Sequence, residues 1–276
     1  SIFRYEFTVQ PEKDEFPFAL PRDWAWCRGD DLFEVIRGVS YRKSEASEEP
    51  ADGLVPILRA HNINVNLNDA KLVHVPEANV SEKQFIRRHD ILIAMSSGSK
   101  NLVGKAAQAE QGMRAGFGAF CGLVRVTPLV CREYVGWFFQ GPLYRHAVAR
   151  RGKGIGINNL RKGDIQQLCI ALPPLAEQKR IVAKVDQLMA LCDKLEQRQQ
   201  ERNECRVRLN GAALHKLTSA ETPADLAKHW RRVGDHFDLL YSVPESVEEL
   251  RKAILQLAVQ GKLVPQDPND EPASVL

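Results

Sequence analysis

Short apolar runs, separated by turn residues, dominate the first 170 positions of the chain. The runs are four to six residues long and rich in Val and Ile, a composition typical of β-strands. Apolar residues also recur at helical spacing over residues 134–150, which predicts one helix in this region. We therefore predict a mixed, mainly β domain over residues 1–170. Its expected strands include Leu54–Leu58, Lys71–Val75, Asp90–Met95 and Cys121–Val126.

After Pro173 and Pro174, the pattern changes to that of a long helix. Prolines fit the first turn of a helix, because the N–H groups there have no intrahelical partner. Apolar residues then follow a 4-3-4-3 rhythm, which places them in one stripe along the helix. The helix is expected to continue to about Leu217, a length of roughly 60 Å at 1.5 Å per residue. The stripe consists of Ile181, Val185, Leu188, Cys192 and Leu195.

A second helix with the same spacing is expected after a loop. Gly261 is a plausible end for it, and the proline-rich run over residues 265–272 is not compatible with a helix. The pattern predicts an α+β protein: the β domain is followed by a long antiparallel helical hairpin or coiled coil over residues 171–264. A linker or tail then covers residues 265–276. The stripe of the second helix consists of Val247, Leu250, Ile254 and Leu257.

Composition argues against several classes of protein. The chain has 276 residues, of which 44% are hydrophobic and 26% charged, and it has no run of about 18 apolar residues. An integral membrane protein is therefore not expected, and the chain starts without a recognisable signal region. The six cysteines form no Cys-x-x-Cys pair and no Cys/His cluster with zinc spacing. This usage is typical of reduced thiols in a cytoplasmic protein, and no metal site is expected.

The net charge of +3 hides a strong polarity along the chain. Residues 1–82 carry 9 basic and 15 acidic residues, whereas residues 83–163 carry 14 basic and only 3 acidic ones. The remainder, residues 164–276, has 15 basic and 17 acidic residues. A basic block of this kind is the expected footprint of a surface that binds phosphates. The alternative is a solvated basic surface that has no partner.

No catalytic motif stands out. The run from Gly98 to Ala106 has five rather than four residues between its glycines, and Ala106 replaces the Ser or Thr that a phosphate-binding P-loop requires. The glycine run from Gly152 to Gly156 has neither a clear preceding strand nor a following helix. The seven histidines are dispersed, without a nucleophile beside them. The sequence therefore points to binding rather than to catalysis.

The candidate DNA-binding residues are small hydroxyls, amides and cations in two glycine-containing segments, together with a basic pair further upstream. Hydroxyls and exposed backbone N–H groups bind phosphates, Arg recognises guanine edges, Asn recognises adenine, and Lys neutralises phosphate. For the serine-rich segment alone, a polar hairpin turn is an equally good interpretation. The set comprises Arg42, Lys43, Ser96, Ser97, Ser99, Lys100, Lys105, Arg145, Arg150, Arg151, Lys153, Asn158 and Asn159.

Four segments of the chain resemble a known family. The run Leu-Pro-Pro-Leu-Ala-Glu-Gln at residues 172–178, with the helix that follows to Leu195, resembles the conserved helix of the specificity (S) subunits of bacterial type I restriction–modification systems. The segments at residues 20–26 and 90–107 resemble the start and the middle of a target recognition domain of that family. The segment at residues 250–268 resembles the conserved stretch that precedes such a domain.

This resemblance implies a non-catalytic subunit that recognises double-stranded DNA. In the family, modification subunits methylate adenine with S-adenosylmethionine and flip the base out of the duplex, and restriction subunits use ATP. Neither cofactor is then expected on this chain. Full S subunits carry two recognition domains held apart by two antiparallel helices, whereas this chain has one. It is therefore expected to be a piece of a longer subunit or a half-subunit that self-associates through its helices.

Two other classes of function remain open at this stage. The first is a stand-alone DNA-modifying enzyme, a methyltransferase or a nuclease, whose motifs are unfamiliar; it would be active without partners. The second is a coiled-coil adaptor that binds only protein, and it predicts no salt-sensitive affinity for DNA.

Overall fold

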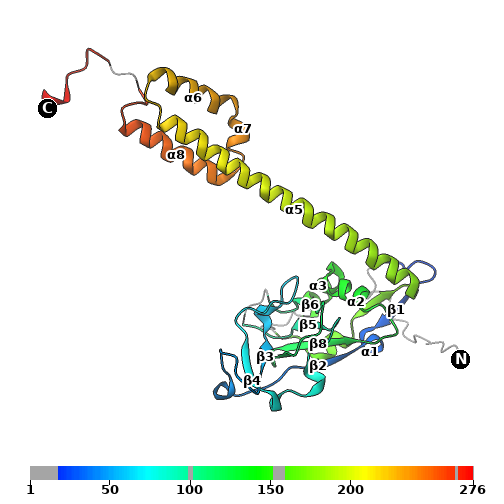
Figure 1. Ribbon diagram of the computed structural model, residues 1–276. Helices are drawn as coiled ribbons and strands as arrows, with labels where there is room; N and C mark the ends of the chain where they lie inside the picture. Colours follow the sequence, from blue (N-terminus) through cyan, green and yellow to red (C-terminus); the bar gives the residue numbers. More distant parts are fainter. Residues whose placement is uncertain (1–17, 99–101, 152–158, 265–266, 276) are drawn as a thin grey trace. The chain divides into compact units, whose positions relative to one another are not determined.

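The computed structural model describes residues 18–98, 102–151, 159–264 and 267–275 of the chain, and these residues belong to two units (Figure 1). Unit 1 ends at Asp186 and contains all the strands found among the described residues, and unit 2 begins at Gln187 and is helical there. The predicted combination of a mixed, mainly β domain with a long helical region is confirmed. No helix in the described ranges combines the length and apolar character needed to cross a membrane.

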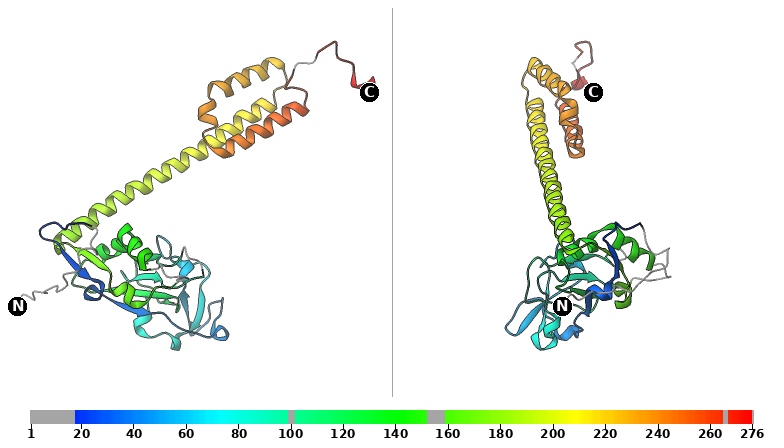
Figure 2. Two further views of the ribbon diagram at one scale, coloured as in Figure 1. Left: turned by 180° about the vertical axis from the view of Figure 1, so that it is seen from behind. Right: turned by 90° about the vertical axis from the view of Figure 1, so that its right-hand side faces the viewer.

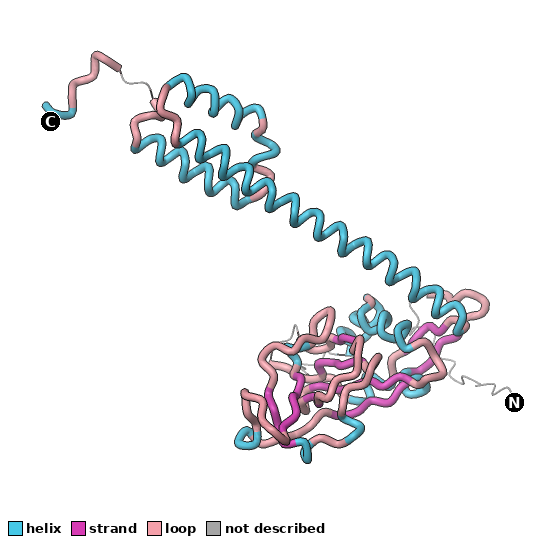
Figure 3. Tube along the Cα trace, viewed as in Figure 1, coloured by secondary structure: helices cyan, strands magenta, loops and turns pink. Residues whose placement is uncertain are grey.

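The central element of unit 1 is a four-stranded antiparallel sheet with the order β2-β8-β5-β6. Figure 3 colours the strands of the unit magenta. Its strands are β2 (Phe33–Arg37), β8 (Cys121–Val126), β5 (Ile91–Ala94) and β6 (Ala106–Gln108). All residues of β5 are buried, which explains why this strand is a continuous apolar run rather than an alternating one. The strands predicted from Asp90 and from Cys121 are thus confirmed, the first with slightly narrower bounds.

Two smaller sheets complete the β structure. The first pairs β3 (Leu54–Leu58) with β4 (Val73–Pro76) in antiparallel and with β7 (Gly116–Phe117) in parallel orientation. The second pairs β1 (Ala25–Arg28) with β9 (Cys169–Leu172), the first and last strands of the unit. Short 3-10 helices occur in the connections, namely η2 (Lys43–Glu45), η3 (Ala60–Asn62), η4 (Glu77–Asn79) and η5 (Glu82–Gln84), and η6 (Ala273–Val275) follows near the chain end.

The predicted helix over residues 134–150 is two helices. They are α2 (Arg132–Gln140) and α3 (Pro142–Arg151), separated at Gly141. The break occurs because Pro142 has no N–H to continue α2, whereas proline fits the first turn of a new helix. Tyr144 and Phe139 pack together in the core, with ring centroids 4.9 Å apart. Two shorter helices, α1 (Gly29–Leu32) and α4 (Lys162–Gln166), also belong to this unit.

The long helix α5 (Leu175–Thr218) begins inside unit 1 and is fixed there by its first turn. The side chain of Gln178 is buried, accepts a bond from the backbone N–H of Cys131 at 2.8 Å, and donates to the carbonyl of Pro173 at 2.8 Å. Beside it, the indole N–H of Trp24 donates to Glu177 at 3.3 Å. Glu177 and Gln178 therefore attach the start of α5 to the β domain.

Unit 2 differs from the predicted hairpin in two respects. The expected loop between the two long helices contains α6 (Pro223–Asp235) and the short α7 (Phe237–Leu240). As a result α8 (Pro244–Val259) runs parallel, not antiparallel, to the end of α5 (Figure 2). The hydrogen-bonded pairs Asn210–Ser246 and Ala220–Lys262 advance in the same direction along both segments, which establishes this orientation.

The predicted pairing of the two apolar stripes within the chain is wrong. Helix α8 packs its Leu250, Ala253 and Leu257 against Leu214 and Leu217 near the end of α5, about five turns beyond the predicted stripe. Val247 and Ile254 of the α8 stripe are half-buried. We call the other stripe the α5 stripe; its first two members are half-buried and the rest exposed, with Leu188 48% and Leu195 64% exposed. The α5 stripe consists of Ile181, Val185, Leu188, Cys192 and Leu195.

Candidate nucleic-acid interface

One end of the four-stranded sheet gathers residues that the sequence marks as DNA-binding. Because its strands are antiparallel, the end of β5 and the start of β6 lie at the same end of the sheet, next to the start of β8. Ser96 and Ser97 follow the end of β5 after one intervening residue, and Lys105 directly precedes β6. We call this part of the sheet the Ser96 end. All three residues are half-buried, so their polar groups retain access to solvent.

A β-bridge joins two of the predicted segments at the Ser96 end. Ser96 pairs with Asn159 in antiparallel orientation, and the N–H of Leu160 donates to the carbonyl of Met95 at 2.7 Å. Asn159 is exposed, whereas Leu160 is buried in the core and anchors the segment. A serine and an asparagine that are 63 positions apart in the sequence are thus neighbours on one surface.

Helix α3 brings further positive charge to the same place. Gly104 has a φ of +80°, and a side chain there would collide with Val148 of α3, so the glycine permits close packing of the loop on the helix. Arg145 of α3 is exposed. Arg150 and Arg151 lie in the last turn of α3, and their side chains are outside the described part of the structure, as are Ser99, Lys100, Lys153 and Asn158 altogether.

The other predicted pair, Arg42 and Lys43, belongs to a different region. Both are exposed and lie at η2, where the backbone N–H of Arg42 donates to Glu45 at 3.0 Å. The following Ser47 forms a β-bridge with His74 of β4, in the three-stranded sheet. Among the described residues, no hydrogen bond or β-bridge joins this pair to the Ser96 end. The structure thus brings Ser96, Ser97, Lys105 and Asn159 together, with the helix that carries Arg145 packed on the loop before Lys105, but not Arg42 and Lys43.

Sequence reasoning missed Phe120, which immediately precedes β8. Its ring is 70% exposed, and its carbonyl accepts hydrogen bonds from the N–H groups of Met95 at 2.9 Å and Ser96 at 3.0 Å. An aromatic residue beside an apolar strand is ordinarily assigned to the core. The signal that would have identified it is the preceding Gly118-Ala119, which indicates a turn.

Arg59 was also missed. It follows β3, whose Leu58 carbonyl accepts the N–H of Gly118 in the turn that carries Phe120. The guanidinium donates through Nη2 to the carbonyl of Lys71 at 2.9 Å, and its buried Nε has no hydrogen-bond partner among the described residues. Arg59 therefore lies next to Gly118 of this turn, and its guanidinium is held by the backbone carbonyl of Lys71.

Neither an ionised thiol at Cys121 nor a metal-binding cluster accompanies these residues in the described ranges. Cys121, next to Phe120, is buried, and burial raises the pKa of its thiol to about 12. A thiol with this pKa is protonated at neutral pH and is a poor nucleophile. The described residues contain no group of three His, Cys, Asp or Glu side chains placed to hold a metal ion. The arrangement provides hydrogen-bond donors, cations and one exposed ring.

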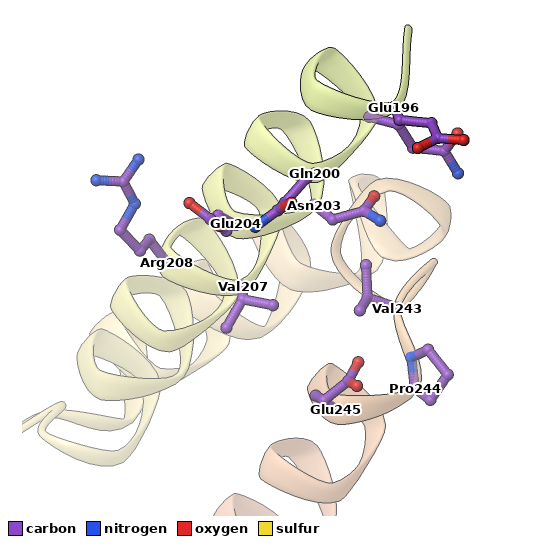
Figure 4. A pocket seen from close by; sticks show the side chains of 10 residues that line it. Glu196, Gln200, Asn203, Glu204, Val207, Arg208, Val243, Pro244 and Glu245 are labelled. Carbon is purple, nitrogen blue, oxygen red and sulfur yellow. Dashed lines mark hydrogen bonds between the residues drawn. The ribbon is translucent and has the colours of Figure 1, made fainter. Parts of the chain in front are cut away.

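A concave site lies in unit 2, between α5 and the start of α8 (Figure 4). Its volume is about 960 Å³, and its lining includes Glu204, Val207, Arg208 and Glu245. Gln200 on the same wall donates to Glu204 at 3.1 Å. The charged residues of this lining are three glutamates and one arginine, so the site lacks the concentration of positive charge that DNA requires.

Comparison with known proteins gives a consistent result. The family model described as the type I restriction modification DNA specificity domain matches residues 21–204. The type I restriction enzyme StySPI specificity subunit of Salmonella potsdam is 35% identical over 218 residues, covering 79% of this chain and 47% of that subunit. The EcoKI specificity subunit of Escherichia coli K12 is 39% identical over 175 residues, covering 63% and 38%. The chain thus spans about half the length of these relatives, or less.

Solved structures share the fold. The HsdS subunit from Thermoanaerobacter tengcongensis aligns with a TM-score of 0.51 at 22% identity, over 66% of this chain and 41% of that one. A chain from a structure concerned with complex assembly and conformational transition of the type I R-M system aligns with a TM-score of 0.52 at 24% identity, over 67% and 43%. Because the family model covers more than half of the chain, the chain belongs to the family of type I restriction–modification specificity subunits.

Proposed function

We propose that this chain recognises one half of a bipartite sequence in double-stranded DNA and presents that DNA to the catalytic subunits of a type I restriction–modification complex. The observation that carries the proposal is the convergence at the Ser96 end, where Ser96 and Lys105 of the β5–β6 hairpin meet Asn159 from a distant part of the sequence. Family membership supports the same assignment. We therefore expect the chain to act in the bacterial cytoplasm, where this DNA lies.

The chemistry of the Ser96 end suits a division between positioning and recognition. Lys105 and Arg145 would neutralise phosphates and fix the orientation of the duplex. Asn159 carries an amide that can donate to and accept from the major-groove edge of adenine. Ser96 and Ser97 offer hydroxyls that bind either phosphate or base edges.

Catalysis would then belong to other subunits. We expect modification subunits to hold S-adenosylmethionine and restriction subunits to hold ATP, with neither bound by this chain. The surface of α5 supports a docking role, since most of the α5 stripe is exposed along the unit 2 part of the helix. A helix with exposed leucines at heptad spacing is suited to pair with another helix, either from a second copy of this chain or from a partner subunit.

The proposal is tested by measuring the affinity of the full chain for duplexes selected from a random-sequence library, over a range of salt concentrations. Phosphate neutralisation predicts a linear fall of log affinity with log salt concentration. Affinity purification from the native host should recover a modification methyltransferase. A chain that binds no DNA and recovers no methyltransferase would contradict the proposal. Methylation or cleavage by the purified chain alone would favour the enzyme alternative instead.

A further inference from the structure

The backbone around Phe120 is held in a defined position. The turn between β7 and β8 is closed by a hydrogen bond from the N–H of Cys121 to the carbonyl of Gly118, at 2.8 Å. The carbonyl of Phe120 itself accepts two further bonds, from Met95 and Ser96. Gly38 packs against this turn so closely that a Cβ at position 38 would overlap the carbonyl of Gly118. The ring is therefore presented by a fixed backbone.

The exposed ring of Phe120 is notable because it lies at the Ser96 end. Single exposed apolar side chains are common on proteins and need no explanation by themselves. Phe120, however, is 70% exposed beside Ser96, whose bridge partner is Asn159. Leu129 has a similar exposure of 60% but follows the other end of β8. The six residues of β8 separate the two positions by roughly 20 Å.

The chemistry of a phenyl ring limits what it can recognise in DNA. Phenylalanine has no hydrogen-bond donor or acceptor, so it cannot distinguish base pairs by their polar edges. The apolar feature of the major groove is the C5-methyl group of thymine, which phenylalanine side chains contact. The neighbouring polar residues at the Ser96 end can bind phosphate and adenine. When they do, the Phe120 ring would enter the major groove beside these residues.

We propose that Phe120 is a specificity-determining residue that recognises a thymine through its methyl group. This assignment rests on the proposed function, since it requires that the Ser96 end contacts DNA. It adds to that function a chemical class of ligand at one position, a thymine-containing base pair. It also adds a residue that belongs to neither of the basic segments predicted from the sequence.

The test replaces each thymine of the selected duplex by uracil, one at a time, and measures the affinity of the full chain. Uracil lacks only the methyl group and keeps the hydrogen bonds of the pair. One replacement should weaken binding by roughly five- to tenfold for the natural protein, within the range expected for one base position. The same replacement should have no further effect on Phe120→Ala, because the methyl group has then lost its partner. Phe120→Leu should retain part of the effect.

The matched control is Leu129→Ala, which removes an equally exposed apolar side chain at the far end of β8. Its affinity should equal that of the natural protein on every duplex. If binding is salt-sensitive but no uracil replacement has an effect that depends on Phe120, the thymine assignment alone is overturned. The same holds if Phe120→Ala weakens binding to all duplexes equally, as expected if the ring inserted between base pairs. Absence of salt-sensitive binding by the natural protein would overturn the proposed function as well.

Discussion

Asn210 of α5 donates from its side-chain Nδ2 to the backbone carbonyl of Ser246 in α8, at a distance of 3.2 Å. Both residues are 1% exposed, and the Asn210 Oδ1 and the Ser246 Oγ have no hydrogen-bond partner among the described residues. A buried polar residue in a helical interface restricts the register of the helices. The bond therefore fixes the parallel alignment of α8 on α5 at one point.

Replacing Asn210 by Asp should destabilise unit 2. The change places a carboxylate oxygen against the Ser246 carbonyl, and we expect a loss on the order of 3 kcal/mol at neutral pH. Burial raises the pKa of an introduced carboxyl group, so the folded state holds its proton more tightly than the unfolded chain does. Stability should accordingly recover as the pH falls.

Urea unfolding followed by circular dichroism at pH 7 and pH 5 measures both effects. The comparison variant is Gln199→Glu, the same amide-to-carboxylate change at an exposed position of α5. Equal stability of the two variants at pH 7 would contradict the role of the Asn210 bond.

The buried ion pair of Asp90 and Arg125 lies at the opposite end of the sheet from Ser96. Arg125 donates to both carboxylate oxygens of Asp90, at 3.0 and 2.6 Å. Arg125→Met leaves Asp90 buried without this partner and should cost about 3–5 kcal/mol of unfolding free energy, measured by urea titration. Arg114→Met, which breaks an exposed pair with Glu77, should change stability by less than about 1 kcal/mol. A small effect of the first change would contradict this ranking.

Two buried thiols should make stability depend on pH above 9. Burial, assisted for Cys27 by the Asp31 carboxylate, raises the pKa of Cys27 and of Cys121 from 9.0 to about 12. In the unfolded chain these thiols ionise near pH 9, so the unfolded state releases protons that the folded state retains. Stability is therefore full below pH 9 and falls as the pH rises towards 12.

Thermal unfolding between pH 8 and pH 10.5 checks this dependence. The Cys121→Ala variant should lose less stability over this range than the natural protein. Cys205→Ala, at an exposed position of α5, should show the unchanged dependence. Identical pH profiles for all three proteins would contradict the assignment.

Two cations at the Ser96 end should contribute separately to DNA binding. Lys105→Ala and Arg145→Ala should each lower the slope of log affinity against log salt concentration by about 1, as expected for one lost phosphate contact. Fluorescence anisotropy with a selected duplex measures the slope. Arg251→Ala on α8, where the arginine pairs with Glu248, serves as the comparison and should leave the slope unchanged. The same measurement applies to Lys100, Arg150 and Arg151.

The α5 stripe should govern association. Leu188→Glu and Leu195→Glu alter exposed positions, so helix content should remain as in the natural protein. Each charge should disrupt pairing with a second copy, detected by light scattering as a loss of the dimer at high concentration. Ala190→Glu, on the opposite face of the same helix, should leave association intact. A natural protein that is a strict monomer at high concentration would contradict self-association.

Strands and the long helix could be predicted from the sequence because burial determines the spacing of apolar residues in these segments. Leu54–Leu58 and Cys121–Val126 coincide with observed strands, and the 4-3-4-3 rhythm identified α5. The direction of α8 could not be predicted, since heptad spacing is the same for parallel and antiparallel helices. The start of α6 carried a readable signal: Thr222 caps the helix by accepting the N–H of Asp225 at 3.1 Å, and Pro223 follows it.

The candidate site was only partly predictable. Polar and basic residues at the Ser96 end were visible because glycines and hydroxyls cluster around them. Their proximity depends on the Ser96–Asn159 bridge, a long-range pairing that no local pattern encodes. Phe120 was not predicted because the residue type alone does not show whether an aromatic side chain is buried or exposed. Its exposure depends on the turn in which it lies.

Pairing of β1 with β9 has a consequence for how such a protein can change its target. Ala25 lies opposite Leu172, so the chain enters and leaves the β domain at adjacent points, right beside the Gln178 attachment of α5. Everything that lies between these two strands is thereby an insertion whose ends meet. Under the proposed function, exchanging this insertion for another of the same kind would change the DNA sequence that is recognised and leave the attachment of α5 unchanged, so the β domain could be replaced as a unit.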